Sequence, residues 1–170
     1  MADVDLGAWY AGKDFTTDWT SQSFPVWSEL LAARRGDAVR ILEIGSWEGR
    51  SALLFLNYLP HSRITCVDTF AGSVEHHAVM GLAHAASACE QRFDRNTVEF
   101  RDRVEKIKAL SSHALGRFAI ERRRFDIVYL DGSHHSADVY ADAGAELAIV
   151  ERRCDRDLRR LRVADDVHAG

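Results

Sequence analysis

Short apolar runs alternate along this chain with longer stretches that favour helix, and this alternation predicts its architecture. The nearly continuous apolar run at residues 39–44 indicates a strand buried on both faces, as in a parallel sheet. Further strands are expected at residues 63–68 and 125–131, with a weaker one at residues 104–111. Helices are expected at residues 23–36, 51–59, 78–93, 112–121 and 137–150. Strands that alternate with helices predict a doubly wound, mostly parallel α/β sheet, which binds ligands at the carboxyl ends of its strands.

Composition narrows the class of protein without identifying a function. The 170 residues suit one domain, with a helical lead-in at residues 1–36 and an α/β domain at residues 37–150. The net charge of −4 implies no general affinity for nucleic acid or anionic membranes. No apolar run approaches the roughly 20 residues that a membrane span needs. The three cysteines are widely spaced and indicate reduced thiols, so we expect a cytoplasmic protein.

The stretch ILEIGSWEGRSALLFL carries the first chemical signal, a glycine turn between a strand and a helix. A nucleoside-triphosphate loop would need a lysine after Gly49, and none is present. A dinucleotide loop would need glycine where Trp47 stands, and the neighbouring Glu48 discourages a diphosphate. A zwitterionic head joined to an adenosine fits better. Glu43 would then face its ammonium through water, and backbone N–H groups of residues 46–51 would face its carboxylate.

An acidic residue at the end of the next strand supports a nucleoside ligand. Asp68 ends the strand expected at residues 63–68, where a carboxylate can accept both hydrogen bonds of a ribose diol. The plainer alternative is that Gly45 and Gly49 only make a tight turn and that Asp68 only caps the segment after it.

Three motifs in order, EIGSWEGRSALLFL, CVDTF and FDIVYLDGSHHSADVYAD, resemble the class I S-adenosylmethionine-dependent methyltransferases. The similarity extends over residues 18–150 and is greatest to a branch that acts on small molecules. It implies a Rossmann-like methyltransferase sheet and S-adenosyl-L-methionine as the cofactor. It also implies that the methionine end is held by Glu43, Gly45, Ser46, Gly49 and Ser51, the ribose by Asp68, and the adenosine near Thr69, Phe70 and Ser111.

The DGSHH turn after the last expected strand supplies the candidate catalytic residues. In related O-methyltransferases an acid at this position helps to bind a divalent cation that lowers the pKa of the acceptor hydroxyl, so the resemblance implies that Asp131 is a ligand for Mg²⁺. His134 matches the motif and can take the proton from the acceptor. The alternative is that Asp131 caps a helix that begins near Ser136, and that His134 and His135 are solvated loop residues.

The tail ERRCDRDLRRLRVADDVHAG, residues 151–170, departs from the resemblance, which implies Gly-Gly and a fifth apolar strand. Codons chosen for residues 153–163 and read in a shifted frame can give Gly-Gly-Val-Ile-Val-Thr-Phe-Asp-Asp-Tyr-Val. We therefore hypothesise a change of reading frame near Glu151 and a sheet that lacks strands 5–7. The alternative is a genuine basic amphipathic helix, because Leu147, Val150, Cys154, Leu158 and Leu161 recur at helical spacing.

The expected function is methyl transfer from S-adenosylmethionine to a hydroxyl of a small-molecule acceptor. One alternative is a truncated, inactive module that binds the cofactor or self-associates through the fourth strand, which would be an exposed sheet edge. Another is an NAD(P)-binding Rossmann protein, which Trp47 and Glu48 disfavour. Binding of S-adenosylhomocysteine, with or without methyl transfer, distinguishes the three.

Overall fold

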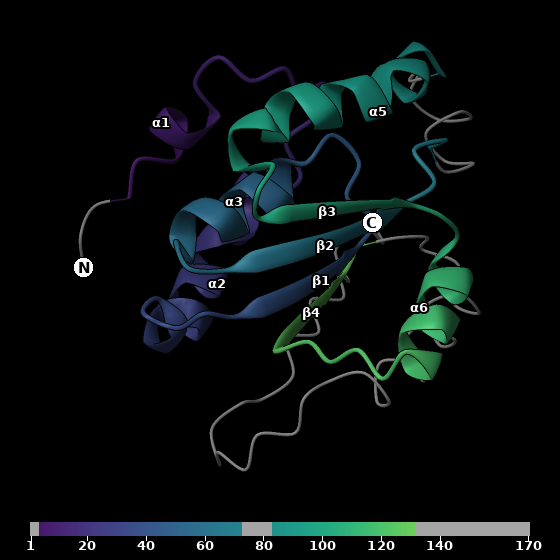
Figure 1. Ribbon diagram of the computed structural model, residues 1–170. Helices are drawn as coiled ribbons and strands as arrows, with labels where there is room; N and C mark the ends of the chain where they lie inside the picture. The colour runs from purple at the N-terminus through teal and green to yellow at the C-terminus, as the bar shows by residue number, and fades with distance from the viewer. Residues whose placement is uncertain (1–3, 73–82, 132–170) are drawn as a thin grey trace, which may run out of the picture.

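Four parallel strands organise the part of the chain that the computed structural model describes, residues 4–72 and 83–131 (Figure 1). They are β1 (Arg40–Ile44), β2 (Arg63–Asp68), β3 (Val104–Lys108) and β4 (Ile127–Leu130). Their order is β3-β2-β1-β4, and Ile41 of β1 pairs with Ile64 of β2 on one side and with Ile127 of β4 on the other. The predicted α/β fold with a mostly parallel sheet is confirmed.

Helices cover both faces of this sheet. They are α1 (Leu6–Tyr10), α2 (Phe24–Leu31), α3 (Arg50–Tyr58), α5 (Ala83–Thr97) and α6 (Ser111–Ile120), with 3₁₀ turns at Ser21–Ser23, Ala32–Arg34 and Val98–Phe100. In Figure 1, α6 lies on the near side of the sheet and α2 and α3 lie behind it. The described helices are all too short or too polar to cross a bilayer.

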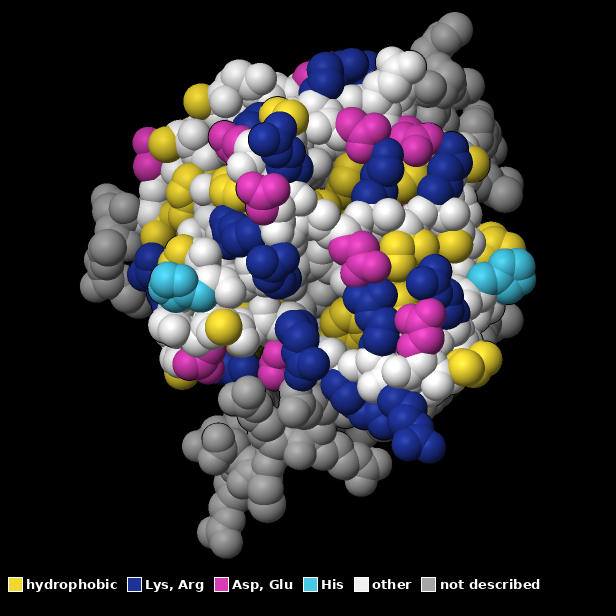
Figure 2. All heavy atoms as spheres, viewed as in Figure 1, with side chains coloured by type: hydrophobic (Ala, Val, Ile, Leu, Met, Phe, Trp, Pro, Cys, Tyr) yellow, Lys and Arg dark blue, Asp and Glu magenta, His cyan; other side chains and the backbone are white. Residues whose placement is uncertain are grey.

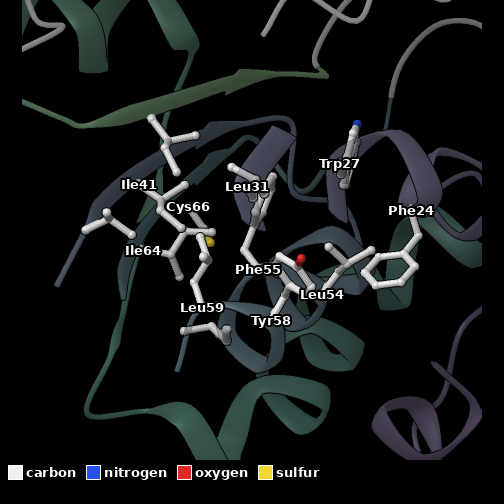
Figure 3. Close-up of a cluster of buried hydrophobic side chains, with 14 of the residues drawn as sticks. Phe24, Trp27, Leu31, Ile41, Leu54, Phe55, Tyr58, Leu59, Ile64 and Cys66 are labelled. Atoms are coloured by element: carbon white, nitrogen blue, oxygen red, sulfur yellow. The ribbon is translucent and has the colours of Figure 1, made fainter. Parts of the chain in front are cut away.

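Burial on both faces explains the continuous apolar run of β1. Ile41 points into the larger apolar cluster, where Trp27 stacks on Phe55 with ring centroids 5.2 Å apart (Figure 3). Leu42 points to the opposite face, into the cluster that α6 covers. Side chains two positions apart share a face of a strand, so Glu43 lies on the same face as Ile41. The fold therefore buries a carboxyl group at the edge of the larger cluster.

Several predicted boundaries differ from the observed ones by a few residues. The helix expected at residues 23–36 is α2 followed by the 3₁₀ turn Ala32–Arg34, and the strand expected at residues 125–131 is the shorter β4. β3 ends at Lys108 rather than at residue 111, because α6 already begins at Ser111. The helix predicted at residues 78–93 continues to Thr97 as α5.

Several predictions fall on residues whose placement the structure does not describe. The helix expected at residues 137–150 and the tail at residues 151–170, with its question of reading frame, lie outside the described ranges. Among the described strands, β4 lies at an edge of the sheet, so association of two copies through that edge stays a prediction.

Candidate functional site

The carboxyl ends of β1, β2 and β4 bring the predicted site residues to one edge of the sheet. The Gly45 N–H donates to the Val67 carbonyl oxygen at 2.9 Å, and the Asp131 N–H donates to the Ile44 carbonyl oxygen at 2.8 Å. These two bonds hold the glycine turn between Asp68, which ends β2, and Asp131, which follows β4. Three segments far apart in the sequence therefore form one site.

The turn depends on glycine at two positions. Gly45 and Gly49 have φ of +86° and +83°, in the left-handed region that side chains disfavour. A Cβ at Gly49 would also lie 3.1 Å from Phe93 and Thr97 of α5. Gly49 is the N-cap of α3 and provides no capping side chain, so the first N–H groups of α3 can bind an anion.

Glu43 lies fully buried beneath this turn. Its Oε1 accepts a hydrogen bond from Ser51 Oγ at 2.5 Å, and its Oε2 accepts one from Cys66 Sγ at 3.4 Å. Desolvation raises the pKa of the Glu43 carboxyl to about 7, against the effect of these hydrogen bonds, and the nearby charge of Asp131 adds to the rise. Through these two hydrogen bonds Glu43, which lies in β1 beneath the turn, links β1 to α3 and to β2.

Ser46 lies beside the Glu43 carboxyl in the same turn and is buried. Its hydroxyl lowers the pKa of Glu43, yet it forms no hydrogen bond of standard geometry with the residues that the structure describes. A buried hydroxyl with unused hydrogen-bonding capacity is costly unless a ligand or water pairs with it. The turn therefore offers a polar group as well as N–H groups to a ligand.

Asp68 connects two neighbouring turns through its carboxylate. Its Oδ2 accepts the Trp47 N–H at 2.8 Å, and its Oδ1 accepts the Phe70 N–H at 2.7 Å. Each carboxylate oxygen can accept a further hydrogen bond, so these contacts leave room for a ribose hydroxyl on either atom. Trp47 has a φ of +46° and Phe70 a φ of +54°, and Asp68 holds the N–H of each of these strained residues.

The residues expected near the adenosine occupy different environments. Phe70 is buried, and its ring packs edge-on against Phe93 with centroids 5.3 Å apart. Thr69 is half-buried beside it, and its Oγ1 accepts the Ala71 N–H at 3.3 Å. Ser111 is half-buried and begins α6, beyond the carboxyl end of β3. Their contacts with adenosine stay predictions.

A small cavity of about 30 Å³ opens beside the turn. It is lined by Gly45, Ser46, Ser51 and Asp131 from the predicted site and by Phe15, Thr17, Trp19 and Thr20 from the N-terminal region. We call residues 11–20 the N-terminal strap. The strap was absent from the predicted site, yet it forms one wall of the cavity.

Glu48 attaches the strap to the turn. Its carboxylate is 1% exposed and accepts the Thr16 N–H at 2.6 Å and the Thr16 hydroxyl at 2.9 Å. Arg92 of α5 donates to the same carboxylate at 3.2 Å, and Asn96 Nδ2 donates to the backbone carbonyl oxygens of both Glu48 and Asp14 at 2.9 Å. Both carboxylate oxygens of Glu48 thus accept hydrogen bonds from the protein itself. The sequence alone indicates Glu48 only as an acid that would repel a diphosphate ligand.

Arg50 makes a second attachment, at the start of α3. Its Nη2 donates to Asp18 Oδ2 at 2.6 Å and to Ser21 Oγ at 3.1 Å. Its guanidinium carbon lies 4.0 Å from the centroid of the Tyr10 ring and 4.9 Å from that of Phe15. None of these partners was among the residues predicted for the site, although Asp18 and Ser21 lie within the region of family resemblance that begins at residue 18. Only the fold identifies them as part of the site.

The candidate catalytic pair is partly described. Asp131 is exposed and lines the cavity, whereas His134 lies outside the described residues. Among the described residues no group of three His, Cys, Asp or Glu side chains could hold a metal ion. Mg²⁺ takes only one or two carboxylates from many proteins, so Asp131 as a Mg²⁺ ligand stays a prediction.

Comparison with known families shows what class of protein has this fold and site. A family described as a methyltransferase domain matches residues 42–154, which include the end of β1, the glycine turn, β2, β3 and β4. The chain belongs to this methyltransferase-domain family. A comparison with curated proteins finds no significant match.

Solved methyltransferase structures share the fold at low sequence identity. The MycE methyltransferase of the mycinamycin biosynthetic pathway, in complex with Mg, SAH and mycinamycin VI, is 22% identical with a TM-score of 0.53. A Staphylococcus aureus protein, provisionally named a caffeoyl-CoA O-methyltransferase, is 12% identical with a TM-score of 0.57. The matches cover 85% and 79% of this chain but only 35% and 55% of those chains.

Replacement of Gly49 should destabilise the protein more than replacement of a glycine outside the site. We expect Gly49→Ala to lower the free energy of unfolding by about 1–3 kcal/mol, because it adds backbone strain and crowds Phe93 and Thr97. Gly36→Ala is the matched control, since a Cβ there would meet nothing within 4 Å and the φ of Gly36 is not left-handed. Equal losses for the two variants in urea denaturation would contradict this account.

The raised pKa of Glu43 predicts a pH-dependent stability term. The folded chain keeps the Glu43 proton up to about pH 7, whereas the unfolded chain releases it near the ordinary value of 4.5. Stability contributed by this group therefore falls as pH rises between these values. The stability of Glu43→Gln relative to the natural chain should increase by up to about 3 kcal/mol between about pH 5 and pH 8. Parallel pH profiles of the two proteins would show that Glu43 is ionised in both states.

Proposed function

We propose that this chain binds S-adenosyl-L-methionine at the Gly45–Gly49 turn and transfers its methyl group to a hydroxyl of a small-molecule acceptor. The observation that carries the proposal is the meeting of the glycine turn, Asp68 and Asp131 at one edge of a parallel sheet, in a member of a methyltransferase-domain family.

The chemistry of the site fits both ends of this cofactor. The uncapped start of α3 and the buried Ser46 hydroxyl suit the carboxylate of the methionine end. The Asp68 carboxylate has spare acceptor capacity for the ribose hydroxyls. Glu43 lies beneath the turn and hydrogen-bonds Ser51, which lines the cavity, so it is the acid that the ammonium of the methionine end would face through water. Glu43 would act indirectly, because it is fully buried.

The residues of the chain would bind, orient and deprotonate. When bound, the cofactor supplies an electrophilic methyl group. Asp68 and the turn would fix its orientation, and alignment of the acceptor oxygen with the methyl carbon is the main source of rate. Asp131 would polarise the acceptor hydroxyl, through a divalent cation where one is bound, and His134 would take the hydroxyl proton. MycE in complex with Mg, SAH and mycinamycin VI supports the cation and a small-molecule acceptor by analogy only.

A dinucleotide is the weaker candidate ligand for the turn. Close approach of a pyrophosphate needs a glycine at the second position of the fingerprint, and Trp47 occupies that position. The centroid of the Trp47 ring lies 6.4 Å from that of Trp19 in the strap, so a bulky side chain packs at the position where the fingerprint has glycine.

Cofactor binding is tested by isothermal titration calorimetry of the full chain with S-adenosylhomocysteine. We expect binding to the natural chain and a loss of at least about tenfold in affinity for Asp68→Asn, because the variant loses a charge-assisted ribose contact. Asp94→Asn, which alters an exposed carboxylate of α5 paired with Lys106, is the matched control. Thermal melting of each variant separates a lost contact from a lost fold. Binding of NAD in place of S-adenosylhomocysteine would contradict the proposal.

Methyl transfer is tested separately from binding, with radiolabelled cofactor and a panel of hydroxylated acceptors. Asp131→Asn should abolish transfer and leave the affinity for S-adenosylhomocysteine within about twofold, because Asp131 is assigned to the acceptor. Binding without transfer in the natural chain would favour the alternative of an inactive cofactor-binding module. Full transfer by Asp131→Asn would exclude the proposed role of this residue.

A further inference from the structure

A second and larger cavity lies at the opposite end of the sheet, over the amino ends of the strands. Its volume is about 520 Å³, within the range of about 300–1,000 Å³ that small-molecule sites occupy. It is lined by the six arginines Arg40, Arg63, Arg103, Arg122, Arg123 and Arg124 and by the three acids Asp102, Glu105 and Glu121. This concentration of positive charge occurs in a chain whose net charge is −4.

The acids of the cavity do not balance its arginines. Glu105 pairs with Arg123, and Glu121 pairs with Arg117, which lies outside the lining. Four lining residues form no ion pair with any residue that the structure describes: Arg63, Arg103, Arg122 and Arg124. Asp102, the third acid of the lining, forms no ion pair with a described residue either, so the unpaired groups of the hollow are four cations and one acid.

Two of these guanidinium groups are fixed close to each other. Arg103 donates to the carbonyl oxygens of Leu56 at 3.0 Å and Pro60 at 2.8 Å, at the end of α3, and Arg63 donates to the carbonyl oxygen of Asp102 at 2.8 Å. Burial lowers the pKa of Arg103, and the positive charge of Arg63 lowers it further. The two guanidinium groups repel each other, and their carbonyl partners are neutral. An anion bound between the two groups would offset this repulsion.

The loop after α6 adds an arginine at a position where glycine is usual. Arg122 has a φ of +54°, and its N–H donates to the Ala119 carbonyl oxygen at 3.2 Å, as in a left-handed helix C-cap. Glycine relieves the strain at such a cap, yet the chain carries arginine there and directly after it, at Arg123 and Arg124. In Figure 2, which has the viewpoint of Figure 1, Lys and Arg side chains are spread over the surface in view, with Asp and Glu side chains among them.

We propose that this cavity binds a small anion with two linked phosphate groups, as free diphosphate or as the diphosphate of a nucleotide. Guanidinium groups match phosphate oxygens with paired hydrogen bonds, and several together favour a multiply charged anion over a single carboxylate. The site is separate from the small cavity beside the Gly45–Gly49 turn, because the two cavities lie at opposite ends of the same strands.

Calorimetric titration of the full chain with inorganic diphosphate tests the site. We expect saturable binding that weakens as ionic strength rises from about 0.05 M to about 0.3 M. Arg63→Ala and Arg122→Ala should each raise Kd about tenfold or more, since each removes a charged contact. Arg101→Ala is the control, because Arg101 is exposed, lies outside the lining and carries the same charge. It should change Kd by less than about twofold.

Titrations with other ligands distinguish free diphosphate from the diphosphate of a nucleotide. They also give the results that would overturn the proposal. Equal affinity for ADP and diphosphate supports a site for the phosphates alone, and tighter binding of ADP supports a nucleotide. No saturable binding of either, or an equal loss in Arg101→Ala, overturns the proposal. Binding of a single-stranded oligonucleotide without binding of diphosphate also overturns it. S-adenosylhomocysteine binding by Arg63→Ala should equal that of the natural chain, which keeps this test distinct from that of the proposed function.

Discussion

A carboxyl group buried under a left-handed turn is the constraint on which the site at the glycine turn depends. Glu43 must lie on the α3 face of β1, because Ile41 and Glu43 share that face and both neighbours of β1 are paired strands. Ser51 and Cys66 then satisfy it from α3 and β2. A buried acid is tolerable only with such partners, so the position of α3 against the sheet and the path of the glycine turn are coupled to one side chain.

The N-terminal strap is attached to the outer side of the same turn. Glu48 and Arg50 flank Gly49, and each binds the strap through charged hydrogen bonds, to Thr16 and to Asp18 respectively. The strap in turn forms a wall of the cavity beside Ser46. Because the strap and the turn are joined by these contacts and both line the cavity, a ligand in the cavity would contact both of them.

The sequence predicted what short-range patterns specify and missed what long-range polar contacts specify. β1 and β2 followed from apolar runs, and the turn followed from the spacing of Gly45 and Gly49. The strap carries no period, and its contacts join residues far apart in the chain, as in the bond from the Asp14 N–H to Asn96 Oδ1. The larger, arginine-lined cavity was not predicted from the sequence either, because most of its lining residues become neighbours only once the strand order is known. Topology, rather than any motif, brings both sets together.

The two cavities lie at opposite ends of the same strands, and the side chains near the two ends differ in charge. Asp68 and Asp131 lie at the carboxyl ends, and the arginines of the larger cavity lie at the amino ends. A strand of five residues spans about 17 Å, whereas screening at physiological salt acts over about 8 Å. Direct electrostatic coupling between ligands at the two ends is therefore weak. Communication between them would have to pass through packing along the strands, as in β2, where Cys66 bonds to Glu43 and Arg63 lines the arginine-lined cavity.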